Sequence, residues 1–255
     1  MGIVNVSPDS FSGDGGAGVE RALAMADAGA DWLDVGGEST RPGSAPVSEA
    51  EELARVIPVI EAIGAGCTTP MSIDTMKPAV ARAAFAAGAR MWNDVTALGG
   101  AADCLETAAD LGGEVVLMHM QGAPATMQDN PRYDDVLGEV TEFLAERAAA
   151  AQAAGVAGER IWLDPGLGFG KTTAHNLALL AGLERIVALG FPVLVGASRK
   201  GLIRTLDPTA TSPADRLGGS LAIALAAARA GAAMVRVHDV RETVQALEVQ
   251  AAIGA

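Results

Sequence analysis

The chain has 255 residues, of which half are apolar and 19% are charged. This size and composition are typical of a folded protein and exclude a disordered polymer, so we expect one domain that spans residues 1–255. Because 31 acidic residues outnumber 18 basic ones, the formal charge is −13, and the sequence offers no basic surface for nucleic acid.

The cysteines and the apolar runs indicate the cellular compartment in which the protein is expected. Cys67 and Cys104 form no CxxC motif, which excludes a local cysteine zinc site and a disulfide framework and fits a reducing cytoplasm. No apolar run approaches the roughly 18 residues of a membrane span. Residues 1–6 lack the cationic region of a signal peptide. We therefore expect a cytoplasmic protein without a membrane partner.

Short runs rich in Val, Ile and Leu alternate along the chain with longer Ala-rich segments that have helical spacing. In chain order, the predicted strands are 2–6, 32–36, 71–74, 90–93, 114–119, 161–164, 192–196 and 233–237. A small-residue stop precedes four of them, and we expect its glycine to end a helix in the left-handed conformation: Gly29, Gly88, Gly190 and Gly231. Eight βα units in about 250 residues favour an α/β fold of the TIM (β/α)8 barrel type over a doubly wound open sheet, which more often has about six strands.

Polar residues cluster where the predicted strands end. In chain order they are Asn5, Glu38 to Arg41, Asp74, Asn93, Asp94, His119, Asp164, Ser198 to Lys200, Arg236 and His238. In a barrel all strand ends of this kind meet at one mouth, where the active site of such enzymes lies. The pattern therefore predicts an active site rather than a scatter of surface polarity.

Asp74, Asn93 and Asp164 together suit a flat heterocycle. A carboxylate accepts two parallel hydrogen bonds, so such groups match an aminopyrimidine edge with several N–H donors. Each residue alone could instead satisfy backbone amides. The nearby loop 165–172 resembles a phosphate loop, but Pro165 stands where the first glycine is required. We interpret it as a loop whose backbone approaches a flat ligand, with Phe169 available to cover a ring face.

The cationic residues point to an anion. Arg236 and His238 alternate on one strand and therefore share a face. Lys200 opens a helix, where an anion is favoured, although it and Lys171 could also be solvated loop lysines. Arg41, in a Gly-rich loop, suggests a cationic lid or a simple turn.

Three histidines without an HExxH motif make a catalytic zinc site improbable. We expect His119 at the mouth with His238, and a structural role for His175 at a helix start.

Eight motifs, one per strand and in order, resemble the dihydropteroate synthases of folate biosynthesis over the whole chain. They are 1–12 (MGIVNVSPDSFS), 34–43 (DVGGESTRPG), 72–75 (SIDT), 93–95 (NDV), 117–122 (LMHMQG), 164–171 (DPGLGFGK), 198–200 (SRK) and 236–240 (RVHDV). The resemblance implies condensation of dihydropterin-CH2-pyrophosphate with p-aminobenzoate to give dihydropteroate and pyrophosphate, assisted by Mg2+. It also implies sulfonamides as inhibitors of this reaction.

The resemblance also implies roles for individual residues. The pterin would be bound by Asp74, Asn93, Met118, Asp164, Phe169 and Lys200. The pyrophosphate would be bound by Asn5, Arg41, Arg236 and His238, with Asn5 as the metal ligand. Two loops would close over the site and complete the p-aminobenzoate pocket, through Asp9, Phe11, Asp14, Thr40 and Pro42, with Gly201 near the carboxylate. The catalytic set would be Asp14, Arg41, Lys200, Arg236 and His238.

The implied mechanism is dissociative and SN1-like. The C–O bond to pyrophosphate breaks first, because the pterin delocalises the methylene cation, and Arg, His and Mg2+ stabilise the departing charge. The arylamine then attacks as a neutral nucleophile, so a strong general base is unnecessary.

Three features depart from the family pattern. An extra glycine, Gly13, precedes Asp14 and the stretch before the helix is shorter, and Gly201 stands where many relatives have serine. The sequence also starts directly at the first predicted strand, where relatives have a short leading segment that we expect to cover the barrel floor. Two alternatives therefore stay open: a pterin-binding paralogue without catalysis, motivated by the altered first loop, and a pterin-dependent methyltransferase barrel. The resemblance further suggests a homodimer through the outer helices, for example through the Ala-rich face of 221–230.

Overall fold

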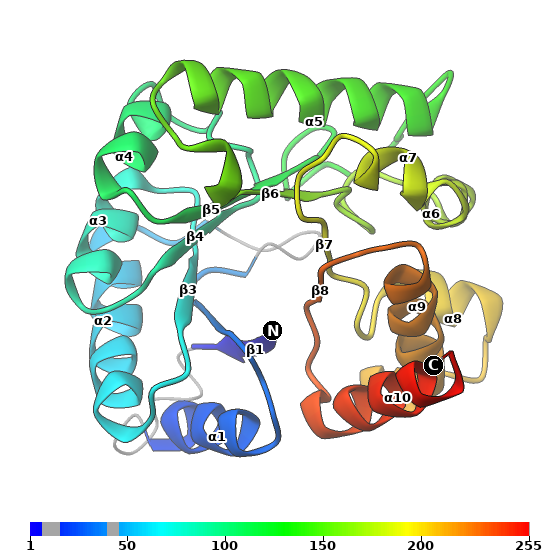
Figure 1. Cartoon of the computed structure of the whole chain (residues 1–255), viewed down its shortest axis with the longest axis horizontal. Helices are drawn as coiled ribbons and strands as arrows, with labels where there is room; N and C mark the ends of the chain where they lie inside the picture. The colour runs from blue at the N-terminus through cyan, green and yellow to red at the C-terminus, as the bar shows by residue number, and fades with distance from the viewer. Residues whose placement is uncertain (7–15, 40–45, 255) are drawn as a thin grey trace.

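The structure is a computed structural model that describes residues 1–6, 16–39 and 46–254. In this part of the chain, helices form an outer ring around the strands (Figure 1). The strands are β1 (Gly2–Asn5), β2 (Leu33–Gly36), β3 (Met71–Asp74), β4 (Met91–Asp94), β5 (Glu114–Met118), β6 (Ile161–Asp164), β7 (Leu194–Val195) and β8 (Met234–Val235). All eight predicted strand positions are confirmed.

The helices follow the strands in alternation. They are α1 (Gly16–Asp27), α2 (Glu49–Gly66), α3 (Pro78–Ala86), α4 (Cys104–Leu111), α5 (Val136–Ala153), α6 (Thr173–Ala181), α7 (Leu183–Val187), α8 (Gly201–Leu206), α9 (Leu217–Arg229) and α10 (Val240–Ile253). Two short 3-10 turns, η2 (Gly158–Arg160) and η3 (Pro213–Arg216), precede β6 and α9. None of these described helices is both long and apolar enough to cross a membrane.

The strands close into a barrel. Strands β1 to β6 form a parallel sheet in sequence order, and β7 pairs with β8. Isolated parallel bridges join the two sheets at both seams, between Leu163 and Val193 and between Gly2 and Val237. At these seams the Leu163 amide donates to the Pro192 carbonyl at 2.9 Å, and the Ile3 amide donates to the Val237 carbonyl at 2.9 Å. The predicted TIM (β/α)8 barrel is confirmed.

The four glycines that were predicted to end helices in the left-handed conformation are also confirmed. Gly29, Gly88, Gly190 and Gly231 have φ of +94°, +118°, +85° and +90°. A side chain with a Cβ rarely adopts this conformation, so glycine lets the chain leave each helix and turn into the next strand.

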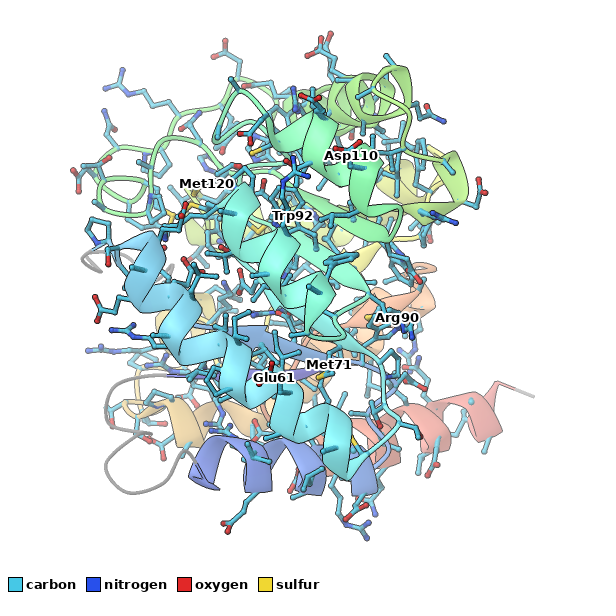
Figure 2. The ribbon with its side chains drawn as sticks, turned by 90° about the vertical axis from the view of Figure 1, so that its left-hand side faces the viewer. Glu61, Met71, Arg90, Trp92, Asp110 and Met120 are labelled. Atoms are coloured by element: carbon cyan, nitrogen blue, oxygen red, sulfur yellow. The ribbon has the colours of Figure 1, made fainter. Side chains whose placement is uncertain are left out.

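The core has two layers. Between the strands and the outer helices lies a large apolar layer that includes Trp92, whose Nε1 donates to the Thr75 carbonyl at 2.8 Å. Figure 2 shows this wall from outside, with Glu61 on the helix layer and Met71 and Trp92 on the strands. Inside the barrel, a second apolar cluster fills the end where the strands begin: Met1, Met91, Val116 and Leu194, with Trp32, Trp162 and Met234 packed against it.

Strand register places polar residues at the other end of the barrel interior. Asn5 lies opposite Gly36, Gly36 opposite Asp74, and Asp74 opposite Asn93. Met118 lies opposite Asp164. Alternate residues of a strand face the same side. The polar strand ends therefore project into the barrel at one level, directly above the apolar cluster.

Candidate active site

A cavity of about 730 Å³ opens at the carboxyl ends of the strands. Seven of the residues to which the resemblance assigns a role line it: Asn5, Asp74, Phe169, Lys200, Gly201, Arg236 and His238. They come from strands β1 and β3, the loop after β6, the segment between β7 and α8, the first residue of α8 and the segment after β8. The strand ends thus meet at one mouth, as a barrel requires.

Three further residues of the predicted set lie buried at the same end of the barrel: Asn93, Met118 and Asp164. The Oδ1 atom of Asp164 accepts a hydrogen bond from the Gly166 amide at 2.7 Å. Burial raises the pKa of this carboxyl, whereas the Gly166 amide and the Lys200 and Arg236 cations lower it. These groups therefore lie deep, at the floor of the mouth.

Six predicted residues lie outside the described part of the chain. They are Asp9, Phe11, Asp14, Thr40, Arg41 and Pro42. Their predicted roles in closing the site and binding p-aminobenzoate and pyrophosphate stay predictions.

A buried carboxylate that the sequence reasoning did not assign organises the floor. Asp34 Oδ2 accepts from Arg236 Nε at 2.5 Å and from Asn93 Nδ2 at 3.1 Å. Arg236 Nη2 donates to Asp74 Oδ2 at 2.8 Å. One guanidinium thus joins two carboxylates, and Asp34 links it to the amide of Asn93. The sequence did contain a signal for Asp34: it is an acidic residue in the middle of an otherwise apolar strand. Because buried charges are rare unless they are paired, such a residue indicates a buried partner.

Two buried oxygens of this floor have no partner among the described residues, Asp34 Oδ1 and Ser72 Oγ. Both residues lie at paired positions of β2 and β3. Unsatisfied buried polar atoms are costly in a closed core and are typical of places that receive a ligand or an ordered water.

The ionisation of Asp74 is poised near neutrality. Burial raises the pKa of Asp74 to about 7, against the effect of the Arg236 guanidinium, which lowers it. Asp34, Glu52 and Asp94 raise it further through charge repulsion. A carboxyl with this pKa changes its hydrogen-bonding capacity between acceptor and donor near neutral pH.

Cations line the side of the mouth that β7, β8 and α1 build. Lys200, Arg236, Arg199, Arg216 and Arg21 all lie on the cavity wall. Sequence reasoning did not identify Arg21 or Arg216, because each lies on a helix or turn far from any strand end. In a chain of net charge −13, such a local excess of positive charge favours an anionic ligand.

His238 is the neutral member of this wall. Its backbone amide donates to Ser198 Oγ at 3.2 Å, and its Nδ1 lies 3.1 Å from the same oxygen. Burial, followed by the positive charges of Arg199 and Arg236, lowers the pKa of His238 to about 4. Arg236 and His238 follow β8 and both line the cavity, but only Arg236 is charged at neutral pH in the unliganded protein. His238 would therefore contact an anion first through an N–H.

The expectation that His119 faces the mouth is wrong. His119 is buried, and its ring packs edge-on against Phe143 at a centroid distance of 4.9 Å. Its Nδ1 lies 2.8 Å from Lys171 Nζ. The residue ends β5 one position after Met118, which lies opposite Asp164, and alternation turns the next side chain away from the barrel interior.

Lys171 and His175 also have defined places. Lys171 is only 2% exposed, so its interpretation as a solvated loop lysine is wrong. The predicted structural role of His175 is confirmed: Thr172 and His175 form a capping box at the start of α6.

A partly buried ion cluster joins the segment after β2 to α2 and to the start of α3. Lys77 Nζ contacts Glu38 Oε2 and Glu52 Oε2, each at 2.5 Å. The other oxygen of Glu38 accepts from the Val47 amide at 3.2 Å. Glu38 therefore links Val47 to Lys77. This role of Lys77 was not predicted from the sequence.

The described residues at the mouth could supply only part of the coordination of the Mg2+ that the resemblance implies. Within residues 1–6, 16–39 and 46–254, no three His, Cys, Asp or Glu side chains gather into a metal site. Asn5, an exposed side chain on the cavity wall, supplies an amide oxygen. Mg2+ prefers oxygen ligands and commonly takes one or two from the protein and the rest from phosphate and water. The donor set fits an ion that is held mainly by a bound pyrophosphate group.

Comparison with known proteins supports the resemblance to the dihydropteroate synthases. The family described as pterin binding enzyme matches residues 1–238. The dihydropteroate synthase of Escherichia coli strain K12 is 51% identical over 255 residues, which cover 98% of this chain and 89% of that protein.

Two solved structures show the likeness in three dimensions. Xanthomonas albilineans dihydropteroate synthase with 4-aminobenzoic acid has a TM-score of 0.93 at 53% identity, covering 100% of this chain and 92% of that one. The same enzyme in complex with 7,8-dihydropteroate has a TM-score of 0.90 at 49% identity, with coverage of 100% and 92%. Because the match spans nearly the whole chain in sequence and in structure, the chain belongs to the dihydropteroate synthases within the pterin binding enzyme family.

Proposed function

We propose that this chain condenses dihydropterin-CH2-pyrophosphate with p-aminobenzoate and releases dihydropteroate and pyrophosphate. The observation that carries the proposal is the division of the mouth. A hydrogen-bonding floor of Asp34, Asp74 and Asn93 lies beside a cationic wall that contains Arg236 and Lys200. A substrate with a polar heterocycle at one end and a pyrophosphate at the other matches this division.

The pterin is proposed to lie on the floor. Asp74 and Asp164 offer carboxylate oxygens to the N–H donors of the aminopyrimidine edge, and Asn93 offers both a donor and an acceptor. Asp34 holds the Asn93 amide nitrogen, so the amide oxygen of Asn93 is oriented for the ligand. Phe169 and Lys200 stand at the wall of the cavity, where they contact a ring face.

The pyrophosphate is proposed to bind Arg236, His238 and Asn5, together with Arg41 from the second loop. Asn5 and the phosphate oxygens would hold Mg2+, which would neutralise part of the leaving-group charge. Arg236 is anchored by Asp34 and Asp74, so its guanidinium is oriented before substrate arrives. Such preorganised charge is effective because it requires no rearrangement as negative charge develops.

The reaction then proceeds by substitution at the methylene carbon. The C–O bond breaks with its electron pair going to the pyrophosphate oxygen, while the pterin delocalises the positive charge. The neutral amine of p-aminobenzoate forms the new C–N bond, and one of its protons leaves to the departing pyrophosphate. His238, neutral with its lowered pKa, supplies a hydrogen bond rather than a proton. A rate that depended strongly on the basicity of the arylamine would contradict this order of steps.

p-Aminobenzoate is proposed to lie between the two loops and the start of α8. Gly201 is the first residue of α8 and lines the cavity. Its backbone N–H lies at the start of the helix, where an amide has no acceptor within the helix, and is proposed to donate to the carboxylate. Phe11, Thr40 and Pro42 complete the pocket in this proposal.

The test is pyrophosphate release from purified protein with the pterin substrate and Mg2+, with and without p-aminobenzoate. Release that requires p-aminobenzoate and falls when a sulfonamide competes supports the synthase. Tight pterin binding without release supports the non-catalytic paralogue instead, and transfer of a methyl group from a reduced folate supports the methyltransferase barrel.

The arrangement of the chain as a single domain in a cytoplasmic homodimer belongs to the same proposal. The closed ring of strands around one interior supports the single domain. On α9, Ala222 and Ala226 are exposed and small enough for close helix packing. Light scattering of the purified protein checks the dimer, because a mass of one chain would contradict it.

A further inference from the structure

The backbone of the loop 165–171 is hydrogen-bonded to four side chains that lie outside it, in β6, in α6 and in the segment between β5 and α5. The Gly166 amide donates to Asp164 and the Gly168 amide donates to Asn176, at 2.7 and 2.8 Å. Gln128 Nε2 donates to the Gly168 carbonyl at 2.6 Å, and Tyr133 Oη donates to the Gly170 carbonyl at 2.9 Å. A loop with its backbone paired in this way has little freedom to move.

Lys171 is the centre of this arrangement. Its Nζ lies 3.0 Å from the Gly166 carbonyl, 3.0 Å from the Phe169 carbonyl and 3.2 Å from the His119 carbonyl. The fourth partner is His119 Nδ1 at 2.8 Å. The ammonium thus connects three parts of the chain: the end of β5, the start of the loop and its tip.

The loop also lies against β5 without free space. A Cβ at Gly166, where φ is +66°, would stand 1.9 Å from the His119 carbonyl oxygen. A Cβ at Gly170, where φ is +61°, would stand 2.3 Å from the Gln121 carbonyl oxygen. Glycine is therefore required at both positions for the close approach that lets Lys171 reach its acceptors.

The tip of the loop contacts a predicted pterin ligand. Phe169 lines the mouth cavity, and Lys200 Nζ stands 4.0 Å from the centroid of its ring. A cation over an aromatic face is attracted by the ring's quadrupole. The Phe169 ring therefore contributes to the position of the Lys200 ammonium.

We propose that Lys171 is a positioning residue for pterin binding: by joining the end of β5 to both ends of its loop, it holds Phe169 and Lys200 against the pterin. This inference rests on the proposed function, and it assigns Lys171 no contact with substrate.

The chemistry of the pair fits this role. Burial lowers the pKa of Lys171 to about 7, with Asp164 raising it and Lys200 lowering it. The side chain has three N–H donors when protonated and two when neutral, so in either form it can donate to more than one carbonyl. Burial, followed by the charge of Lys171, lowers the pKa of His119 to about 3, so its ring is neutral and Nδ1 accepts. A residue without donors at position 171 would remove a partner from the Phe169 and His119 carbonyls and would leave the Gly166 carbonyl with only the Phe169 amide, at 3.1 Å.

The test compares Lys171→Met with two variants. Tyr133→Phe removes one bond to the same loop but leaves Lys171 in place. Val59→Ala loses packing in α2, in the core on the far side of β3, and serves as the stability control. The measurements are the melting temperature, the Kd for the hydroxymethyl dihydropterin that lacks pyrophosphate, and the Kd for inorganic pyrophosphate with Mg2+.

For Lys171→Met we expect the Kd for the pterin and the KM for the pterin substrate to rise about tenfold, with the Kd for pyrophosphate within about twofold of wild type. Tyr133→Phe should raise the pterin Kd less, because Lys171 still holds Phe169. Lys171→Arg should restore part of the affinity. Amide hydrogen exchange of segment 165–171 in Lys171→Met should accelerate without ligand.

The inference is overturned if Lys171→Met binds the pterin with the wild-type Kd, or if Val59→Ala with an equal loss of melting temperature raises that Kd as much. If Lys171→Met does not fold, His119→Leu removes the ammonium's Nδ1 acceptor and should raise the pterin Kd about threefold; an unchanged Kd again overturns it. Wild-type protein that binds pterin but releases no pyrophosphate would contradict the proposed function while leaving this inference standing.

Discussion

The two ends of the barrel interior use opposite chemistry. Where the strands begin, Met91, Val116, Leu194 and Trp162 pack as an apolar cluster. Where they end, Asp34, Asp74, Asn93 and Arg236 are paired through directed hydrogen bonds.

Apolar contacts are not directional, so the loss of a methylene group at the apolar end weakens only the packing around it. A buried ion network fails as a unit, because each removed partner leaves a charge unpaired. Both ends therefore contribute to stability, whereas only the polar end holds the groups that are proposed to bind substrate.

The largest effect is expected at the polar end. Arg236→Met leaves Asp34 and Asp74 as buried carboxylates without their cation, so the free energy of unfolding should fall by about 3–5 kcal/mol. Because the pyrophosphate loses its anchored guanidinium, kcat should fall about 10²- to 10³-fold. Urea unfolding and pyrophosphate release measure the two effects. A variant that keeps wild-type turnover would contradict the proposed role of this residue.

A matched substitution at the apolar end should lower stability while leaving activity nearly unchanged. Leu194→Ala removes a fully buried side chain beneath the floor and should lower the free energy of unfolding by about 2–5 kcal/mol. At a temperature where the variant is folded, kcat/KM should stay within about twofold of wild type. A loss of activity as large as that of Arg236→Met would show that the two ends are not separable.

Ionisation of Asp74 provides a third comparison. With its pKa raised to about 7, this carboxyl is increasingly protonated below that pH and loses acceptor capacity. The affinity for the pterin should therefore rise up to about tenfold from pH 6 to pH 8, since one pKa unit is a factor of ten. Calorimetric titration at several pH values measures this rise.

The same shift has an opposite consequence for stability. Between pH 3.8 and about 7, folded Asp74 holds a proton that the unfolded chain has released, so its contribution to the free energy of unfolding falls as pH rises through this window. Asp74→Asn should remove that part of the pH dependence. An identical pH profile in wild type and variant would show that other carboxyls, such as Asp164, account for it.

The smallest effect is expected at the start of α8. Nothing lies within 4 Å of a Cβ placed at Gly201, so Gly201→Ser fits without rearrangement. Its hydroxyl adds one hydrogen bond to the proposed p-aminobenzoate carboxylate, worth about 0.5–1.5 kcal/mol, and should lower the KM for p-aminobenzoate about threefold. Gly201→Ala is the control. If both variants change that KM equally, the effect comes from the helix backbone and not from the hydroxyl.

Most of the fold could be predicted from the sequence, because its signals are local. Apolar runs of strand length, helical spacing between them and a glycine before four strands depend on near neighbours in the chain. The bounds of β7 and β8 were harder to predict. Each of these strands has only two residues, and the neighbouring Val193 and Val237 pair only through single bridges.

The site was predictable only in part. Strand ends identified Asn5, Asp74, Lys200, Arg236 and His238 as mouth residues, since a barrel brings all such ends together. Asp34 escaped because its role depends on two residues 59 and 202 positions away.

By itself, the sequence determined an eight-strand alternation with polar residues at one end, since backbone periodicity and side-chain polarity are properties of short segments. Only the tertiary structure decided which way the strand-end groups face and with what charge. It turned His119 outward to Lys171, buried that lysine under its own loop, and made His238 neutral among arginines. The physical reason is that direction, burial and pKa depend on neighbours from other strands, and those neighbours come together only when the barrel closes.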